Sequence, residues 1–346
     1  MKIGNKTISE NSGVFIIAEL SANHNGSLDT AIETIRAAKR AGADCIKLQT
    51  YTADTITIDS QEPDFMIKGT IWEGKNLYRL YREAYTPWEW HETLFKTAAE
   101  AGLECFSSPF DKTAVDLLEK LGAPAYKIAS FEITDIPLIE YVASKGKPVI
   151  ISTGIATEED IQMALDACYR MHNHDVALLK CTSSYPAPVE EANMVMVKDM
   201  ATRFNVLTGL SDHTMGATVP VVATCFGAGI IEKHFILDRS IGGPDSSFSM
   251  NEMEFSAMVK SVREAEAAMG RVDYSLTEKM VESRRFSRSL YVVEDIRAGE
   301  VLTEANIRSI RPGYGLHPRY YNRILGKTAR TTLKRGTRLS LDDINP

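Results

Sequence analysis

The sequence lacks the features of several large protein classes. Its 346 residues contain no apolar run approaching about 18 residues, and MKIGNKTISE at the start carries no apolar segment, so export and membrane spanning are not expected. Cysteine is scarce, odd in number and never spaced as CxxC. We therefore expect reduced, buried thiols in a cytoplasmic protein. The five cysteines are Cys45, Cys105, Cys168, Cys181 and Cys225.

Positive charge is also in short supply. Lys and Arg number 39 against 46 Asp and Glu, and the resulting net charge of −7 argues against a general nucleic-acid binder. No GxGxxG motif follows the first predicted strand, which argues against a dinucleotide-binding open sheet. The composition of the whole chain, 44% hydrophobic and 25% charged, is that of an ordinary globular protein. Its length suits one large domain and a small one.

A repeating unit extends from Val14 to about Met269: a short apolar strand, polar residues at its end, then an amphipathic helical stretch. Connections through helices make neighbouring strands parallel. Eight alternations predict an α/β fold, a (β/α)8 TIM barrel, with a doubly wound open sheet as the alternative. The predicted strands are Val14–Glu19, Cys45–Gln49, Glu104–Ser107, Ala125–Ala129, Pro148–Ser152, Ala177–Cys181, Val206–Leu210 and Gly229–Glu232, and Ala217–Gly227 is the helix between the last two.

Two further segments depart from this repeat. The insertion Tyr51–Pro87 is long for a strand–helix loop, and we interpret it as a wall over the active end. After a first domain of residues 1–271, Val272–Arg285 is predicted as a linker or helix, and Phe286–Pro346 as a small, mainly β module. Two half-repeats, DIRAGEVLTEANI and TLKRGTRLSLDDI, give that module a pseudo-symmetric pattern. The aromatic residues of the insertion are Phe65, Trp72, Tyr78, Tyr81 and Tyr85.

The last segment reverses the charge of the chain. Residues 286–346 carry 11 Lys and Arg against 6 Asp and Glu, a net charge of +5, which leaves −12 for the remainder of the −7 total. Two interpretations are open: a solvated basic face, or a module that lends cations to an anionic substrate.

Two predicted strands are followed within three residues by a histidine, and an acidic residue is close by in each case. His213 follows Asp212, and His234 follows Glu232 after one lysine. A lone histidine is usually a hydrogen-bonded structural residue, and we interpret His24, in a glycine-containing loop, in that way. Two histidines at matched strand ends instead favour a divalent metal site with open positions, for which Mg²⁺, Mn²⁺ and Co²⁺ are all suitable.

Charged residues also occupy strands that are otherwise apolar. Lys47 and Lys127 lie among buried positions with serines nearby, which favours a pocket for a phosphate and a carboxylate. The alternative pairs each lysine with a buried carboxylate such as Glu19. The carboxylates Glu19, Glu132 and Glu232 are candidates for bonds to sugar hydroxyls or for proton transfer.

Eight motifs at these strand ends resemble those of the sialic acid synthase family. They are AELSANHNG (18–26), KLQTYT (47–52), FSSPFD (106–111), YKIASFE (126–132), STGIAT (152–157), CTSSYP (181–186), GLSDHT (209–214) and EKHFILD (232–238). RSLYVVEDIRAGEVLT and RPGYGLHP resemble the family's C-terminal antifreeze-like (SAF, β-clip) domain. Ser183 stands where members that use N-acetylmannosamine carry Asn, and IKGTIWEGKNLYRLY favours a subfamily that uses a 2,4-diacetamido-2,4,6-trideoxy sugar.

The resemblance implies a homodimeric transferase that condenses phosphoenolpyruvate with an N-acetylated amino-sugar aldehyde. It implies that His213 and His234 hold a divalent metal ion, and Glu232 is the candidate base. Residues implied to bind phosphoenolpyruvate are Lys47, Ser108, Lys127, Ser130, Ser152 and Ser211. Residues implied to face the sugar are Glu19, Glu132, Tyr185, Asp245 and, from the tail domain of a partner subunit, Arg311.

Two competing hypotheses come from other classes. A Schiff-base aldolase would use Lys180 or Lys127 as its nucleophile, but the serine-rich anion pocket and the paired histidines argue against it. A non-enzymatic ice-binding protein would need a flat, uncharged face, whereas the tail carries 11 Lys and Arg.

Overall fold

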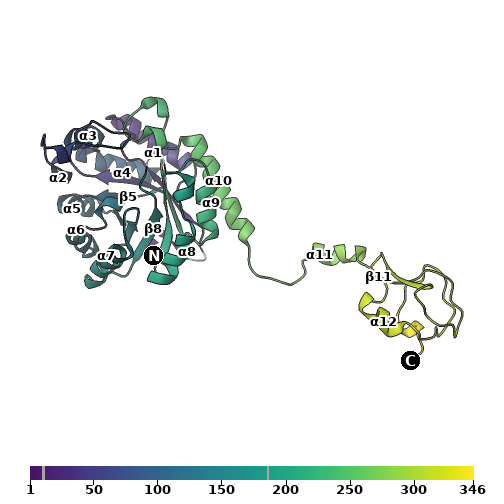
Figure 1. Cartoon of the computed structure of the whole chain (residues 1–346). Helices are drawn as coiled ribbons and strands as arrows, with labels where there is room; N and C mark the ends of the chain where they lie inside the picture. Colours follow the sequence, from purple (N-terminus) through teal and green to yellow (C-terminus); the bar gives the residue numbers. More distant parts are fainter. Residues whose placement is uncertain (10–11, 185–186) are drawn as a thin grey trace. The chain divides into compact units, whose positions relative to one another are not determined.

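The computed structural model describes residues 1–9, 12–184 and 187–346, and its first unit, Met1–Gly270, contains a closed barrel (Figure 1). Eight strands follow one another in the order β10-β3-β4-β5-β6-β7-β8-β9, each parallel to its neighbours. The predicted TIM barrel is confirmed. The strands are β3 (Phe15–Glu19), β4 (Cys45–Thr50), β5 (Glu104–Pro109), β6 (Tyr126–Ile128), β7 (Val149–Ser152), β8 (Val176–Cys181), β9 (Leu207–Asp212) and β10 (Ile230–His234).

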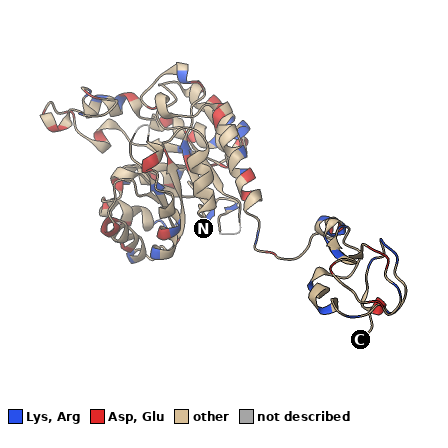
Figure 2. Cartoon of the chain, turned by 45° about the vertical axis from the view of Figure 1, so that its right-hand side comes forward, with Lys and Arg blue, Asp and Glu red and all other residues tan. Residues whose placement is uncertain are grey.

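Helices surround the barrel, and Figure 2 shows charges of both signs on them. Side-chain caps define their starts: Ser27 accepts a hydrogen bond from the backbone of Thr30 at α1, and Asp111 does the same at α5. The predicted helix after β9 is α9, slightly shorter than expected. The outer helices are α1 (Leu28–Arg40), α4 (His91–Glu100), α5 (Lys112–Lys120), α6 (Ile136–Ala143), α7 (Glu158–Arg170), α8 (Val195–Phe204), α9 (Thr218–Cys225) and α10 (Glu252–Met269).

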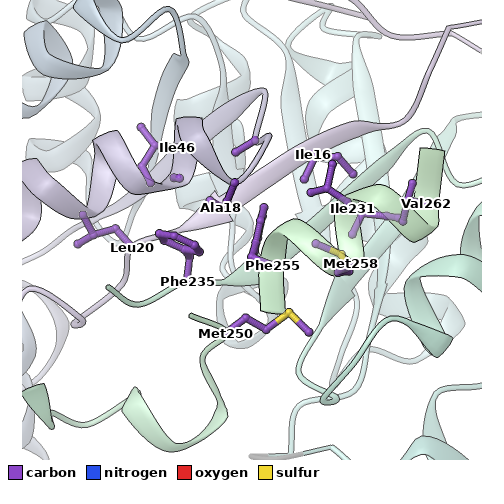
Figure 3. Close-up of a cluster of buried hydrophobic side chains, with 14 of the residues drawn as sticks. Ile16, Ala18, Leu20, Ile46, Ile231, Phe235, Met250, Phe255, Met258 and Val262 are labelled. Atoms are coloured by element: carbon purple, nitrogen blue, oxygen red, sulfur yellow. The ribbon is translucent and has the colours of Figure 1, made fainter. Parts of the chain in front are cut away.

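Side chains alternate between the inside and the outside of the barrel, as the period of a strand requires. Phe15 and Ile17 belong to the cluster inside the barrel, whereas Ile16 and Ala18 pack outward against the helices (Figure 3). The next inward position on β3 is Glu19. Apolar layers therefore fill the lower barrel, and the last inward position of this strand is charged.

The N-terminal hairpin was not predicted. Its strands β1 (Lys2–Ile3) and β2 (Lys6–Thr7) are antiparallel, and Ile3 and Ile8 join the cluster inside the barrel. The fully buried side chains of Ile3 and Ile8 contribute apolar surface to the barrel interior.

The insertion after β4 contains short elements. They are α2 (Ala53–Ile56), a 3-10 turn at Pro63–Phe65 and α3 (Leu77–Ala84), with Asn76 capping the start of α3. The indole N–H of Trp72 donates to the carbonyl of Pro244 at 3.1 Å. This bond ties the insertion to the loop that follows β10.

The second unit, Arg271–Pro346, has a core of its own. Strands β11 (Ser289–Val292) and β12 (Ile307–Ile310) pair antiparallel, and isolated bridges connect the two half-repeats, for example Ile296 with Leu333. The segment predicted as linker or helix contains α11 (Glu278–Ser283), and a short α12 (Tyr321–Ile324) follows β12.

The structure shows how the cysteines are placed and whether any helix could cross a membrane. Four cysteines are buried, but Cys225 is exposed, because α9 ends there on the outer face of the barrel; burial was therefore wrong for that residue. Among the residues described, no helix is long and apolar enough to cross a membrane.

Candidate active site

A cavity of about 410 Å³ lies where the barrel strands end. Most residues singled out in the sequence line it. They are Glu19, Lys47, Lys127, Ser130, Glu132, Ser152, Ser211, His213, Glu232, His234 and Asp245.

Three predicted residues are not placed on this cavity. Ser108 is buried at the end of β5 and is not among the described lining residues. Tyr185 lies outside the described residues. Arg311 is an exposed residue of the second unit. His24 is structural as expected, since its Nδ1 accepts a hydrogen bond from the backbone N–H of Gly26 at 3.1 Å.

Strand alternation decides which lysines reach the cavity. Lys47 and Lys127 occupy inward positions and line it, whereas Lys180 follows the outward Leu178 and donates to the carbonyl of Cys181 at 2.7 Å. Lys180 is not among the described lining residues, so the Schiff-base hypothesis is left with Lys127 alone.

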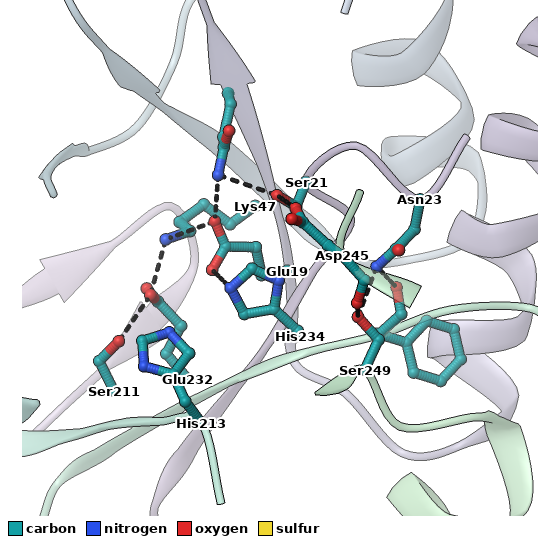
Figure 4. A network of polar contacts seen from close by, with 12 residues as sticks. Glu19, Ser21, Asn23, Lys47, Ser211, His213, Glu232, His234, Asp245 and Ser249 are labelled. Atoms are coloured by element: carbon teal, nitrogen blue, oxygen red, sulfur yellow. Dashed lines mark hydrogen bonds and ion pairs between the residues drawn. The ribbon is translucent and has the colours of Figure 1, made fainter. Parts of the chain in front are cut away.

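Lys47 is paired with two carboxylates at the base of the cavity (Figure 4). Its Nζ lies 2.6 Å from Glu232 Oε1 and 3.1 Å from Glu19 Oε1. Burial opposes the charge of Lys47, but the two carboxylates outweigh it and raise the pKa of the ammonium. Burial likewise opposes the charge of Glu19, yet Lys47 and a hydrogen bond from Gln49 hold the pKa of that carboxyl well below its usual range. The pairing considered as the alternative for Lys47 is thus present in the structure.

Lys127 is less fully paired than Lys47. Its Nζ donates to the carbonyl of Ile128 at 3.0 Å, and Glu232 Oε1 is 3.9 Å away. Burial lowers the pKa of Lys127. Ser108 Oγ, Ser152 Oγ and Glu232 Oε2 are buried without a hydrogen-bond partner in the described part of the chain. Unused serine hydroxyls in a site with a buried cation favour a polar, anionic ligand, whereas the unused carboxylate oxygen of Glu232 requires a hydrogen-bond donor such as water.

The two histidines approach each other at the strand ends, with ring centroids 5.3 Å apart (Figure 4). His213 Nδ1 lies 2.9 Å from the carbonyl of Thr182, which can only accept, so Nε2 is the acceptor nitrogen of the neutral ring. His234 Nε2 lies 3.2 Å from Glu19, so Nδ1 is its acceptor. Burial lowers the pKa of His234 and favours the neutral ring.

These histidines fit a divalent ion in an open site. His234 Nδ1 is buried with no partner among the described residues. A metal-binding imidazole needs a nitrogen whose lone pair is available in this way. No group of three His, Cys, Asp or Glu side chains in residues 1–9, 12–184 and 187–346 could hold an ion alone. An ion there would complete its coordination with water or substrate.

Gln49 and Ser21 belong to the site, although neither of them was assigned a role from the sequence. Gln49 Nε2 donates to Glu19 Oε1 at 2.9 Å and to Ser21 Oγ at 3.0 Å, and Ser21 Oγ donates to Asp245 Oδ2 at 2.5 Å. Hydrogen bonds therefore run from Asp245 to Glu19, which contacts His234. Gln49 stands two residues after Lys47 on β4, and that spacing was the signal available in the sequence.

Two groups in the cavity have a pKa near neutrality. Burial raises the pKa of Glu132 to about 7, and its Oε2 has no hydrogen-bond partner among the described atoms. Although burial opposes it, the contact with His213 lowers the pKa of the Cys181 thiol to about 7. Cys181, an inward residue of β8, was not predicted as part of the site.

Apolar side chains line the outer part of the cavity. The insertion Tyr51–Pro87 supplies many of them, so its interpretation as a wall is confirmed. Of its aromatic residues named above, Trp72 and Tyr81 line the cavity; Phe65, Tyr78 and Tyr85 are not among the described lining residues. The insertion's apolar contributors are Tyr51, Ile56, Ile67, Trp72, Leu77, Leu80, Tyr81 and Ala84.

A (β/α)8 barrel with paired histidines, buried lysines, serines and carboxylates at its strand ends defines a class: a barrel enzyme acting on a polar, anionic substrate. Comparison with known protein families identifies the family within this class. The NeuB family model matches residues 34–274, and the SAF domain model matches residues 287–345. The chain belongs to the NeuB family, the sialic acid synthases that its motifs resemble.

Similar proteins cover almost the whole chain. A pseudaminic acid synthase from Helicobacter pylori is 50% identical over 95% of this chain and 97% of its own, and one from Campylobacter jejuni is 48% identical over 99% of both. The crystal structure of the Bacillus subtilis spore coat polysaccharide biosynthesis protein SpsE aligns with a TM-score of 0.68 at 33% identity, covering 100% of this chain and 99% of that one.

Proposed function

We propose that this chain has pseudaminic acid synthase activity: it condenses phosphoenolpyruvate with 2,4-diacetamido-2,4,6-trideoxy-L-altrose to give pseudaminic acid and phosphate. The observation that carries the proposal is the 48–50% identity, over nearly the full chain, to two enzymes of that name. The alternative, N-acetylneuraminate or legionaminic acid synthesis from another N-acetylated amino sugar, is not favoured, because two legionaminic acid synthases among the relatives are only 33–35% identical.

Phosphoenolpyruvate binds at the base of the cavity. Lys127 donates to a backbone carbonyl, so its ammonium can still bind phosphate, and Lys47 adds a second positive charge. Ser130, Ser152 and Ser211 line the cavity, and the buried Ser152 Oγ has no partner among the described residues. The serines assigned to this ligand are Ser108, Ser130, Ser152 and Ser211.

His213 and His234 are the residues that would hold a divalent ion, Mn²⁺, Mg²⁺ or Co²⁺. Such an ion, when bound, supplies Lewis-acid polarisation of the aldehyde oxygen. Added positive charge suits a cavity that holds Glu19, Glu232 and an anionic substrate together. We expect EDTA to abolish turnover and Mn²⁺ or Mg²⁺ to restore it; undiminished turnover in a metal-free preparation would contradict this assignment.

The reaction forms one C–C bond, forms one C–O bond from water to C2 and breaks the C–O bond from C2 to phosphate. C3 of phosphoenolpyruvate attacks the aldehyde carbon, and Glu132, whose pKa is about 7, donates a proton to the resulting alkoxide. Water then adds to the electron-poor C2, and Glu232 Oε2, unpartnered among the described atoms, accepts its proton. The C2–O bond of the tetrahedral phosphohemiketal to phosphate then breaks, its hydroxyl becomes the ketone of the product, and the hydroxyl proton leaves with the phosphate. The bridging oxygen of phosphoenolpyruvate therefore leaves with phosphate, and ¹⁸O in that position that stays in the sugar acid would contradict this sequence of steps.

The active unit is a homodimer in which each tail covers the barrel of the partner subunit and Arg311 reaches the sugar. The net charge of +5 on residues 286–346 against −12 on the remainder supports attraction between tail and barrel. A guanidinium offers several donors in a fixed plane, which suits sugar hydroxyls and acetamides.

Product identification tests the proposed function. The purified chain is incubated with phosphoenolpyruvate, Mn²⁺ and each of a panel of amino-sugar aldehydes, and the sugar acids are identified by mass spectrometry and NMR. The 2,4-diacetamido-2,4,6-trideoxy-L-altrose reaction should have the highest kcat/KM. A preference for N-acetylmannosamine or for the legionaminic precursor would reject this substrate assignment. Borohydride trapping of pyruvate on Lys127 would favour the Schiff-base class instead.

A further inference from the structure

A buried ion pair lies behind the two histidines. Lys233 Nζ is 2.5 Å from Asp212 Oδ2, and both side chains are 1% exposed. The two residues are in register on β10 and β9. Because successive side chains of a strand point to opposite faces, this pair lies on the outer side of the barrel wall, whereas the adjacent His213 and His234 line the cavity.

Further hydrogen bonds join this pair to the residue after His213. Asp212 Oδ1 accepts from the backbone N–H of Thr214 at 2.9 Å and from its hydroxyl at 2.8 Å. The ammonium of Lys233 also donates to the carbonyl of Thr214. Both chain neighbours of His213 are therefore bonded to Lys233, which itself immediately precedes His234.

Fold stability alone gives little reason for charges at this position. Apolar side chains of similar volume replace a buried ion pair with little loss, because the pair's attraction is offset by the desolvation of both charges. Neither residue is among the described lining residues of the cavity, and no proposed chemical step uses them. The distinctive property of the pair is its position, one residue from each histidine.

We propose that Asp212 and Lys233 are positioning residues that fix the separation and orientation of His213 and His234 and thereby set the affinity of the site for its divalent ion. The inference rests on the metal-binding role proposed for these histidines. Groups that hydrogen-bond to metal ligands typically contribute about 10–100-fold to affinity, and this pair would act on the two histidines through the backbone beside them.

Direct Mn²⁺ titration of the full-length chain tests this inference. Free Mn²⁺ is followed by its EPR signal, with no substrate present. The variant combines Lys233→Met with Asp212→Asn, which leaves no unpaired buried charge and keeps an oxygen for the bonds from Thr214. We expect the Mn²⁺ dissociation constant to rise about 10–100-fold. At saturating Mn²⁺, kcat should stay close to that of the parent chain.

A partly exposed ion pair at the other end of the barrel provides the control. Lys147, just before β7, lies 2.6 Å from Glu119. Combining Lys147→Met with Glu119→Gln removes an ion pair that is remote from the histidines and should leave Mn²⁺ affinity unchanged, with little effect on thermal stability. An unchanged dissociation constant in the Lys233/Asp212 variant, with or without lower stability, would overturn the positioning role.

Two more variants separate the remaining outcomes. If the Lys233/Asp212 variant does not fold by circular dichroism, Thr214→Val removes a single bond to Asp212 and should weaken Mn²⁺ binding to a smaller degree. Unchanged affinity there would overturn the inference. His234→Ala tests the metal site itself: undiminished Mn²⁺ binding would overturn both proposals. Loss in His234→Ala with parent-like affinity in the other variants would overturn only the positioning role.

Discussion

Lys47 Nζ lies 2.6 Å from Glu232 Oε1 across β3, and both residues are only 2% exposed. A buried ion pair needs further hydrogen bonds to offset desolvation, and Glu232 Oε1 receives one from Ser211 at 3.2 Å. Glu19 is the second carboxylate on the same ammonium. Lys47 therefore stabilises the fold through its two ion pairs, and its positive charge is also available to a ligand.

The first prediction concerns the stability of the barrel. Lys47→Met leaves Glu19 and Glu232 buried without their principal cation, so we expect a loss of about 3–5 kcal/mol in the free energy of unfolding. The lowered pKa of Glu19 contributes stability above its unfolded pKa, and the substitution removes that contribution. Urea unfolding at pH 7.5 and pH 4 measures the effect, and the deficit should shrink at pH 4, where carboxyls take up protons. An equal deficit at both pH values would contradict this explanation.

Lys127→Met should behave differently, because Lys127 has no carboxylate within 3.5 Å in the described chain; Glu232 is 3.9 Å away. One cationic contact to phosphoenolpyruvate is lost, so its apparent KM should rise with a smaller change in kcat. Steady-state kinetics at saturating sugar measures both values. A fall in kcat with unchanged KM would instead assign Lys127 a role in the chemical step.

Much of this site was predictable because strand ends and side-chain alternation follow local rules. Glu19, Lys47, Glu232 and His234 occupy inward positions on strands whose apolar residues identify the barrel wall. The bond between Trp72 and Pro244 was not predictable, because it joins loops 172 residues apart and depends on how each loop folds. Loop contacts have no comparable periodic signal.

The pH dependence of stability tests the environment of Glu132. Its pKa is raised from the usual 4.5 to about 7, so the folded chain retains this proton more readily than the unfolded chain. Its contribution to stability is therefore present below pH 4.5 and is lost as pH rises to 7. Glu132→Gln should stabilise the substrate-free chain at pH 8 by about 1–3 kcal/mol relative to pH 4.5. Thermal unfolding measures this difference, with the exposed Glu159→Gln as control. Equal effects of the two substitutions would refute the raised pKa.

Substrate choice should depend on the apolar part of the insertion. Ile67 lines the cavity and suits the methyl group of a 6-deoxy sugar. Ile67→Ser should reduce the preference for the trideoxy sugar over its 6-hydroxy analogue by about 1–3 kcal/mol, measured as the ratio of kcat/KM values. Tyr78→Phe is the control, because its hydroxyl bonds to Asp54 rather than facing the cavity. Equal changes in both variants would locate specificity elsewhere.

Subunit complementation tests whether the tail acts in trans. Arg311→Ala removes the residue assigned to the tail and leaves the barrel intact, whereas His234→Ala does the reverse. In a mixed dimer, one of the two sites combines an intact barrel with an intact tail from the partner. Random exchange makes half of the dimers mixed, so activity should recover to about a quarter of that of the parent chain if the sites are independent. Native mass spectrometry establishes that exchange has occurred.

If mixed dimers form and remain inactive, Arg311 serves the barrel of its own chain. The attraction between the +5 tail and the −12 remainder would then act within one subunit.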